Sequence, residues 1–201
     1  MKKIIYIFMI IMLFTGCSSK PITVEKSNGD SKAYLFLKDK YSPDKYYFEF
    51  YDRNISANDK AKIIMARDNN KYYYSISGDN DIAIIQKDGF KYTVDFKLKS
   101  YSEVSEKNIM DNSFGILPRN MEEFKTLGYI KGKERIFNQS LEYEKYDYGN
   151  IETTYFFKGK NLVYIKCKQP TKTITLKYIN YKKKVSDKLF DVPKKYVEMT
   201  Y

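Results

Sequence analysis

Alternation of apolar and polar side chains with a period of two residues is the feature that most constrains this fold. Successive side chains of a β-strand point to opposite faces of the sheet, so such runs predict half-buried strands. The clearest run predicts five inward-facing residues, namely Phe90, Tyr92, Val94, Phe96 and Leu98. Further strand-like runs cover residues 46–51, 61–67, 72–76, 82–85, 129–137, 141–148, 153–158, 162–168 and 173–181. The chain is therefore predicted to be mainly β.

The alternation is interrupted between residues 101 and 127. Acidic and apolar side chains at mixed spacings predict two short helices there, separated by Gly115-Ile116-Leu117-Pro118. Asp30 or Ser31 could cap another helix over 32–40, although 34–37 could equally be a strand. A wide antiparallel sheet curls, and helices can cover its open face. We expect a mainly β (α+β) domain: a curved antiparallel half-open β-barrel with a short mid-chain helical insertion.

The first residues have the pattern of an export signal. Lys2 and Lys3 precede an uninterrupted apolar run over 4–14, which is too short to span a bilayer but suits a signal peptide. The following Thr15-Gly16-Cys17 resembles a bacterial lipobox. That resemblance implies cleavage before Cys17 and lipidation of its thiol with a diacylglycerol, followed by acylation of the palmitate type. An ordinary signal peptide with a chance cysteine at its cleavage site is the alternative.

This interpretation divides the chain into three parts. Residues 1–16 form the signal peptide, 17–32 hold the lipidated cysteine and a flexible linker, and 33–201 form the β domain. The mature protein is expected outside the cytoplasm, anchored to the cell membrane or to a spore membrane. With Cys17 acylated, Cys167 has no intrachain disulfide partner. A buried, inert thiol is the favoured interpretation, with a reactive thiol or an intermolecular disulfide as alternatives.

Composition excludes several kinds of catalytic centre. The chain has no histidine and two cysteines, which rules out Ser-His-Asp and Cys-His catalysis, imidazole metal sites and four-cysteine zinc sites. The paired carboxylates are interpreted as solvated surface, namely Glu142 with Glu144 and Glu122 with Glu123. Asp79-Asn80-Asp81 is interpreted as a turn rather than a cation loop. We expect no enzyme activity, no catalytic residue, no metal and no cofactor.

The chain carries a formal net charge of +11. Its densest basic run is Lys182-Lys183-Lys184, followed by Lys188, Lys194 and Lys195. An extracytoplasmic location argues against nucleic acid, so anionic lipid, wall polymers or an acidic protein are the expected partners; a solvated basic face is the alternative. The tyrosine-rich 143–148 could form a partner-binding edge. Edge strands also permit strand addition or a swapped homodimer.

The order of these features resembles the LolA/LolB-like superfamily of lipoproteins and lipoprotein carriers. The segment 189–196 matches its C-terminal signature, which implies that Phe190 tucks under the barrel and that Pro193 fixes the chain exit. Within that superfamily the chain also resembles the GerS-type germination lipoproteins of clostridia. That resemblance implies a role in spore germination as the non-catalytic partner of an N-acetylmuramoyl-L-alanine amidase of the spore cortex.

Two other functions stay open. The chain could be a lipid or lipopeptide carrier that uses the barrel cavity, or a hydrolase that relies on carboxylates alone. A carrier needs a large, connected apolar cavity, whereas a partner protein can fill its barrel with side chains.

Overall fold

The computed structural model describes residues 23–54, 61–78, 81–108 and 115–199. The strands are β1 (Val24–Glu25), β2 (Lys45–Asp52), β3 (Lys62–Asp68), β4 (Lys71–Ser77), β5 (Ile82–Lys87), β6 (Phe90–Asp95), β7 (Ser100–Ser105), β8 (Tyr129–Ile136), β9 (Gln139–Asp147), β10 (Glu152–Lys158), β11 (Asn161–Lys168), β12 (Thr173–Tyr181) and β13 (Val197–Glu198). The helices are α2 (Lys32–Leu37), α3 (Met121–Thr126) and the 3₁₀ turn η1 (Asp187–Phe190). The prediction of a mainly β chain is confirmed.

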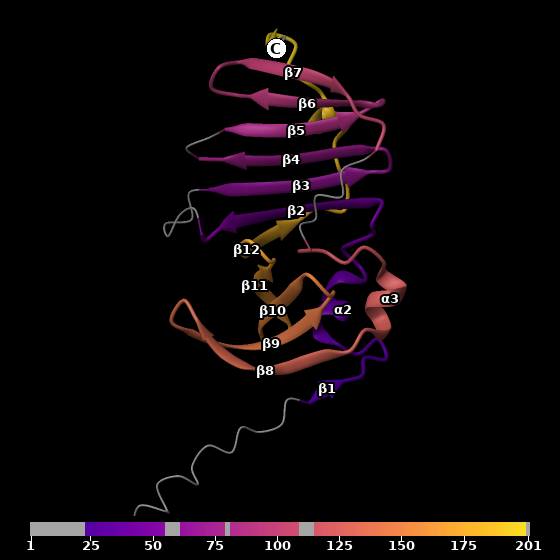
Figure 1. The fold of residues 1–201 in the computed structure, drawn as a ribbon, viewed down its shortest axis with the longest axis vertical. Helices are drawn as coiled ribbons and strands as arrows, with labels where there is room; N and C mark the ends of the chain where they lie inside the picture. The colour runs from indigo at the N-terminus through magenta and orange to yellow at the C-terminus, as the bar shows by residue number, and fades with distance from the viewer. Residues whose placement is uncertain (1–22, 55–60, 79–80, 109–114, 200–201) are drawn as a thin grey trace, which may run out of the picture.

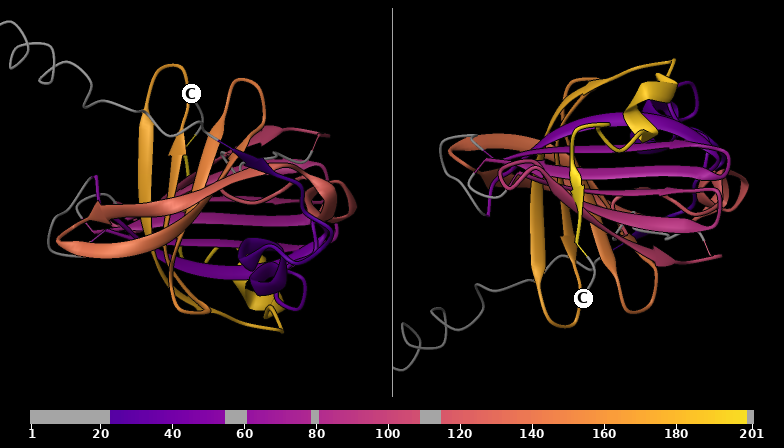
Figure 2. Two further views of the ribbon diagram at one scale, coloured as in Figure 1. Left: turned by 90° about the horizontal axis from the view of Figure 1, so that it is seen from below. Right: turned by 90° about the horizontal axis from the view of Figure 1, so that it is seen from above.

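These strands form one open 13-stranded sheet in the order β1-β8-β9-β10-β11-β12-β2-β3-β4-β5-β6-β7-β13. All neighbouring pairs are antiparallel except β13 with β7, which is parallel. The sheet does not close into a barrel, and its edge strands β1 and β13 lie toward opposite ends of the molecule (Figure 1). It twists so strongly that β10–β12 cross the direction of β3–β6 (Figure 2).

The sheet buries apolar residues on both faces. On β2, Phe48 and Phe50 contribute to the larger core, whereas Tyr47 contributes to a second core on the opposite face. We call the first side the inner face and the second the outer face. Helices α2 and α3 cover the inner face, with Leu37 and Phe124 buried in its core. This two-sided burial explains why five of the eight residues of β2 are aromatic.

The N-terminal helix forms where Ser31 was expected to cap it. The Ser31 side chain accepts a hydrogen bond from the Tyr34 amide, which satisfies one of the unpaired donors of the first turn. The strand alternative for 34–37 is wrong. Helix α3 is the second of the two expected mid-chain helices, and Asn120 caps it by accepting from the amides of Glu122 and Glu123.

The expectation of helix immediately after residue 101 is wrong, because Ser100–Ser105 forms β7 and pairs along its whole length with β6. The connecting turn starts at Asp95, whose Oδ1 accepts from the amides of Lys97 and Leu98 at 2.9 and 2.8 Å. Leu98 therefore lies in a turn and is 70% exposed, not inward-facing as predicted. Residues 109–114 lie outside the described part of the chain.

The C-terminal segment crosses the outer face. Phe190 is buried there against Ala83 and Ile85, so its predicted burial is confirmed. Ion pairs from Lys71 to Asp187 at 2.7 Å and from Lys87 to Asp191 at 2.8 Å hold η1 against the sheet. Within the described residues, no helix is both long and apolar enough to cross a membrane.

Candidate binding pocket

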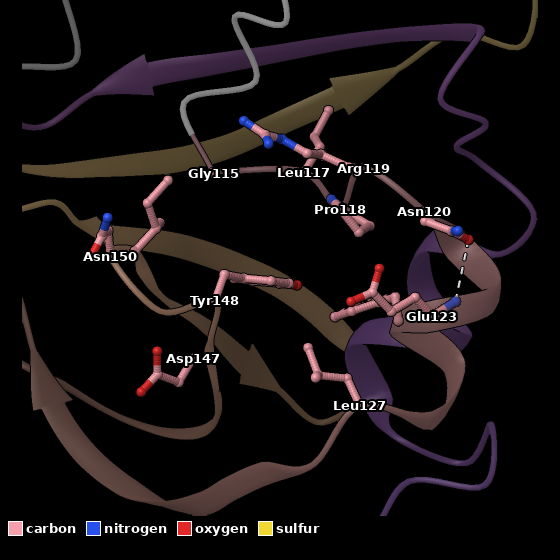
Figure 3. A pocket seen from close by; sticks show the side chains of 12 residues that line it. Gly115, Leu117, Pro118, Arg119, Asn120, Glu123, Leu127, Asp147, Tyr148 and Asn150 are labelled. Carbon is pink, nitrogen blue, oxygen red and sulfur yellow. Dashed lines mark hydrogen bonds between the residues drawn. The ribbon is translucent and has the colours of Figure 1, made fainter.

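A pocket of about 550 Å³ opens between α3, the turn after β9 and the segment that precedes α3 (Figure 3). Its apolar lining includes Leu117, Phe124, Leu127 and Ile151. Its polar lining consists of Arg119, Asn120, Glu123, Asp147, Tyr148 and Asn150, with Gly115 and Pro118 completing the wall. An apolar floor with a few convergent polar groups is the usual composition of a ligand site.

The segment Gly115–Pro118 lies against the inner face and forms one wall of this pocket. Three side-chain hydroxyls donate to its carbonyls: Thr153 to Gly115 at 2.6 Å, Tyr155 to Ile116 at 2.9 Å, and Tyr41 to Pro118 at 2.6 Å. Because buried carbonyls need partners, these bonds fix the path of the segment.

The segment also fills the inner face with side chains. Ile116 and Leu117 are 3% and 2% exposed. Gly115 has φ of +73°, and a Cβ there would lie 2.4 Å from Ile151 Cγ2, so only glycine fits. Leu117 lines the first pocket, whereas Ile116 lines another of about 330 Å³ beside Tyr74 and Leu176. The buried segment therefore lies between two separate hollows.

Two carboxylates and a phenol give the first pocket its polar character. In Figure 3 the Tyr148 hydroxyl points toward the Glu123 side of the pocket. Burial raises the pKa of Tyr148, and the negative charge of Glu123 raises it further, so the phenol stays protonated. Asp147 accepts from the Gly149 amide at 2.8 Å. Because Arg119 lines the same pocket, this arrangement suits an amphipathic ligand that carries both hydrogen-bond donors and acceptors.

The two predicted carboxylate pairs differ in burial, because one of them contains a buried residue. Glu144 was expected to be solvated, but it is 5% exposed. Its two oxygens accept from the amides of Lys32 at 2.8 Å and Ala33 at 2.9 Å, so it holds the N-terminus of α2. Glu142 pairs with the Lys32 ammonium at the surface. Because Glu144 is used structurally, the two do not form an acid–base pair.

The second acidic pair, Glu122 and Glu123, is exposed as expected. Sequence reasoning missed that Glu123 faces a pocket, because the spacing within α3 does not show what the helix packs beside. Asp79 and Asn80 lie outside the described residues, while Asp81 accepts from the Gly78 amide at 2.9 Å, as in a turn. In the described ranges, no group of three or more acidic or cysteine side chains could hold a metal.

Cys167 is fully buried in the inner core and is not in a disulfide. Burial raises the pKa of its thiol, which fits the expected inert group. Cys17 lies outside the described residues, so the predicted lipidation stays a prediction.

The tyrosine-rich run 143–148 does not form a sheet edge. Most of it belongs to β9, which pairs with β8 on one side and β10 on the other, and Tyr146 is fully buried. The edges instead belong to β1 and β13. Each pairs with only two residues of its neighbour, β8 or β7.

The basic run after β12 is exposed throughout, and one of its lysines also packs against the sheet. The Lys182 ammonium lies 3.5 Å from the largely buried Glu49 and 4.4 Å from the ring centre of Tyr47. Lys183 and Lys184 are exposed, as are Lys188, Lys194 and Lys195. Lys182 therefore contacts the outer face while its side chain stays 53% exposed, and its neighbours are exposed as well.

No protein-family model and no curated protein matches the chain. Among solved structures, the crystal structure of an uncharacterized conserved protein from Thermus thermophilus is similar, with a TM-score of 0.45 and 8% identity. The match covers 84% of this chain and 97% of that chain. A similarity of this size carries no functional argument. The structure itself therefore gives the class: a mainly β protein with a single open sheet and a small pocket lined by both polar and apolar residues.

Proposed function

We propose that this protein is a lipid-anchored, extracytoplasmic, non-enzymatic binding protein with a LolA-like β domain. Cys17 carries the anchor, and the domain acts by binding another protein at the membrane. The proposal of an anchor comes from the apolar run and lipobox-like sequence at the N-terminus. The absence of histidine from the chain supports a role without catalysis of its own.

The division of the inner face is the observation that favours a protein partner over a carrier, because the 115–118 segment separates two hollows of about 550 and 330 Å³. A lipid carrier needs a wide apolar space, but here Ile116, Leu117, Leu37 and Phe124 occupy that face. Three hydroxyl-to-carbonyl hydrogen bonds hold the 115–118 segment in place. Emptying the inner face would break these bonds and expose buried side chains, which costs free energy.

We further propose that the partner is an N-acetylmuramoyl-L-alanine amidase of the spore cortex, as the resemblance to GerS-type germination lipoproteins implies. Such amidases use zinc-activated water. The lipoprotein would contribute a surface that binds the active conformer of the amidase and so raises its population. Exposed lysines would accelerate association with an acidic partner. A homodimer joined through sheet edges is compatible with this role.

The test mixes the purified soluble domain with the purified amidase catalytic domain. Complex formation is measured by light scattering, and amidase activity is measured on muropeptides with and without the lipoprotein. We expect a complex at micromolar concentrations, higher amidase activity in its presence, and an association rate that falls with salt. Absence of both a complex and an activity change would contradict the amidase role. Hydrolysis by the lipoprotein alone would contradict the non-enzymatic role.

Carriage of a lipid or lipopeptide is the second candidate, favoured by the pocket of about 550 Å³ with its apolar floor of Leu117, Phe124 and Leu127. Its test is native mass spectrometry of the protein purified from the source membrane. A stoichiometric lipid that is lost in a Leu127→Glu variant, but retained in a Leu35→Glu variant on the exposed side of α2, would favour the carrier.

A further inference from the structure

A row of basic side chains lies along β8. Lys131, Lys133 and Arg135 are exposed and, because strand side chains alternate, they share one face. We call these three residues the β8 stripe. In the register of the sheet they lie opposite Glu144, Glu142 and Ser140 of β9, which places the stripe on the inner face. Among the described residues, the two-residue strand β1 alone pairs with β8 on its other side.

The acidic groups near the stripe neutralise it only in part. Lys131 lies 3.1 Å from Glu25 Oε1, yet 61% of its side chain stays exposed. Glu142 lies opposite Lys133 in register but pairs with Lys32. The buried Glu144 is bonded to backbone amides of α2. Counting Lys32, four basic groups lie near the carboxylates Glu25, Glu142 and Glu144, and Asp30 acts on Tyr129 at the start of β8. The excess of positive charge therefore lies toward Arg135, which faces the uncharged Ser140.

The position of the stripe places it near the proposed anchor. Cys17 precedes Val24, the first residue of β1, by seven positions, and seven extended residues span at most about 25 Å. The β8 end of the sheet must therefore stay close to the bilayer surface. Figure 2, in its view from below, shows β8 and α2 at this end. Electrostatic attraction falls off within about 8 Å at physiological salt, so only the nearest charges contribute.

We propose that the β8 stripe binds the phosphate headgroups of the anionic bilayer that carries the anchor, and thereby orients the domain on the membrane. This inference rests on the proposed lipid anchor for its geometry. A basic surface beside an acyl chain makes membrane attachment more stable, since each Lys or Arg near an anionic leaflet adds attraction. In this orientation β8 faces the bilayer, and the β7 end of the sheet points away from it (Figure 1).

The test removes the acyl chain, so that its result does not depend on lipidation. The mature chain from residue 17, carrying Cys17→Ser, is titrated with vesicles of phosphatidylcholine alone and with equal parts phosphatidylcholine and phosphatidylglycerol. We expect binding to the anionic vesicles only, and its loss at high salt. The triple variant Lys131→Gln, Lys133→Gln, Arg135→Gln should bind them roughly 10- to 100-fold more weakly.

A matched variant changes the same number of charges elsewhere. Lys183 and Lys184 are exposed on the segment that leads into η1, and Lys188 is exposed within η1, which packs on β4 and β5 at the outer face. Replacing these three with Gln should leave vesicle binding within about twofold, since they lie far from the proposed contact. Thermal unfolding of both variants checks that each is folded.

Three outcomes would overturn the proposal. The first is equal loss in both triple variants, which would show that only net charge matters. The second is equal binding of the wild-type chain to neutral and anionic vesicles. The third is a β8 triple variant that binds anionic vesicles as tightly as the wild-type chain but has lost affinity for a soluble anionic wall polymer. Fatty-acid labelling of Cys17 is measured separately, so failure of the anchor and failure of the stripe are distinguishable.

Discussion

A single buried carboxylate joins helix α2 to the sheet. Glu144 on β9 accepts hydrogen bonds from the first two amides of the helix and from the Tyr146 hydroxyl at 3.1 Å. Those amides have no partner within the helix, and the helix dipole favours a negative charge at that end. One side chain therefore satisfies donors that would otherwise be buried and unpaired.

We predict that Glu144→Gln lowers the free energy of unfolding by about 2–3 kcal/mol, because the amide cannot replace both charged acceptors. Chemical denaturation with circular dichroism measures this loss. Glu142→Gln is the matched control, since Glu142 lies on the same strand face but at the surface. It should change stability much less, because exposed ion pairs contribute little. Equal losses in the two variants would contradict the capping role.

The Cys167 thiol should be protected from reagents in the folded protein. It is fully buried, and burial raises its pKa, so little reactive thiolate forms near neutral pH. In the Cys17→Ser chain, we expect a thiol reagent to label Cys167 only at the rate of unfolding, and at once in denaturant. Rapid labelling under native conditions would support the alternative of a reactive thiol.

Residue burial was only partly predictable even where the alternation was most regular, because Phe90 and Leu98 of the clearest run are 38% and 70% exposed. Val94 and Cys167 are buried as their strand positions suggest. Glu144 was misjudged because the helix that it caps is 112 positions away in sequence. A charged residue surrounded by Lys and Tyr gives no local sign of such a partner.

At the scale of elements, the 115–118 segment connects the helices to the sheet, and three hydrogen bonds fix its path. Gly115 and Pro118 correctly marked a segment without helix before α3, but the sequence did not indicate that this segment would be buried. Three of its carbonyls accept from hydroxyls in two separate parts of the chain, β10 and the segment before β2. Sequence spacing alone could not identify those donors.

We predict that Tyr155→Phe destabilises the protein by about 1–2 kcal/mol, because the Ile116 carbonyl loses a buried donor. The variant should also loosen the wall of the pocket, which hydrogen exchange at Ile116 and Leu117 can measure. Tyr164→Phe is the control, since Tyr164 is similarly buried but accepts only a long 3.4 Å bond from Gln139. An unchanged exchange rate in Tyr155→Phe would contradict the pinning role.

Strands were easier to predict than the short elements between them. Most regular runs became strands near their expected bounds, because alternation reflects burial on one face. The error at 100–105 arose because Glu103 and the acidic residues after it resemble a helical surface, whereas pairing with β6 decides the outcome. Tertiary pairing overrides local propensity in such segments.

For the whole molecule, one long sheet carries an inner core, an outer core and a smaller cluster around Phe156 on the outer face, and it places its edges far apart. The inner core lies under the helices, and the outer core lies under η1 and the C-terminal segment. That antiparallel strands would curl into one sheet was predictable from their number. The parallel pairing of β13 with β7 was not, since two residues give no recognisable pattern. The small pocket was also unpredictable, because it depends on how a buried segment crosses the sheet.

The central claim is that this domain works on a membrane through an acyl chain on Cys17. Metabolic labelling with radioactive palmitate in the producing bacterium tests it most directly, with Cys17→Ala as the variant and Cys167→Ala as the matched control. We predict that the wild-type chain and Cys167→Ala incorporate label, whereas Cys17→Ala incorporates none and accumulates as unprocessed precursor. Undiminished labelling of Cys17→Ala, or an unlabelled wild-type chain released from the membrane, would contradict the account.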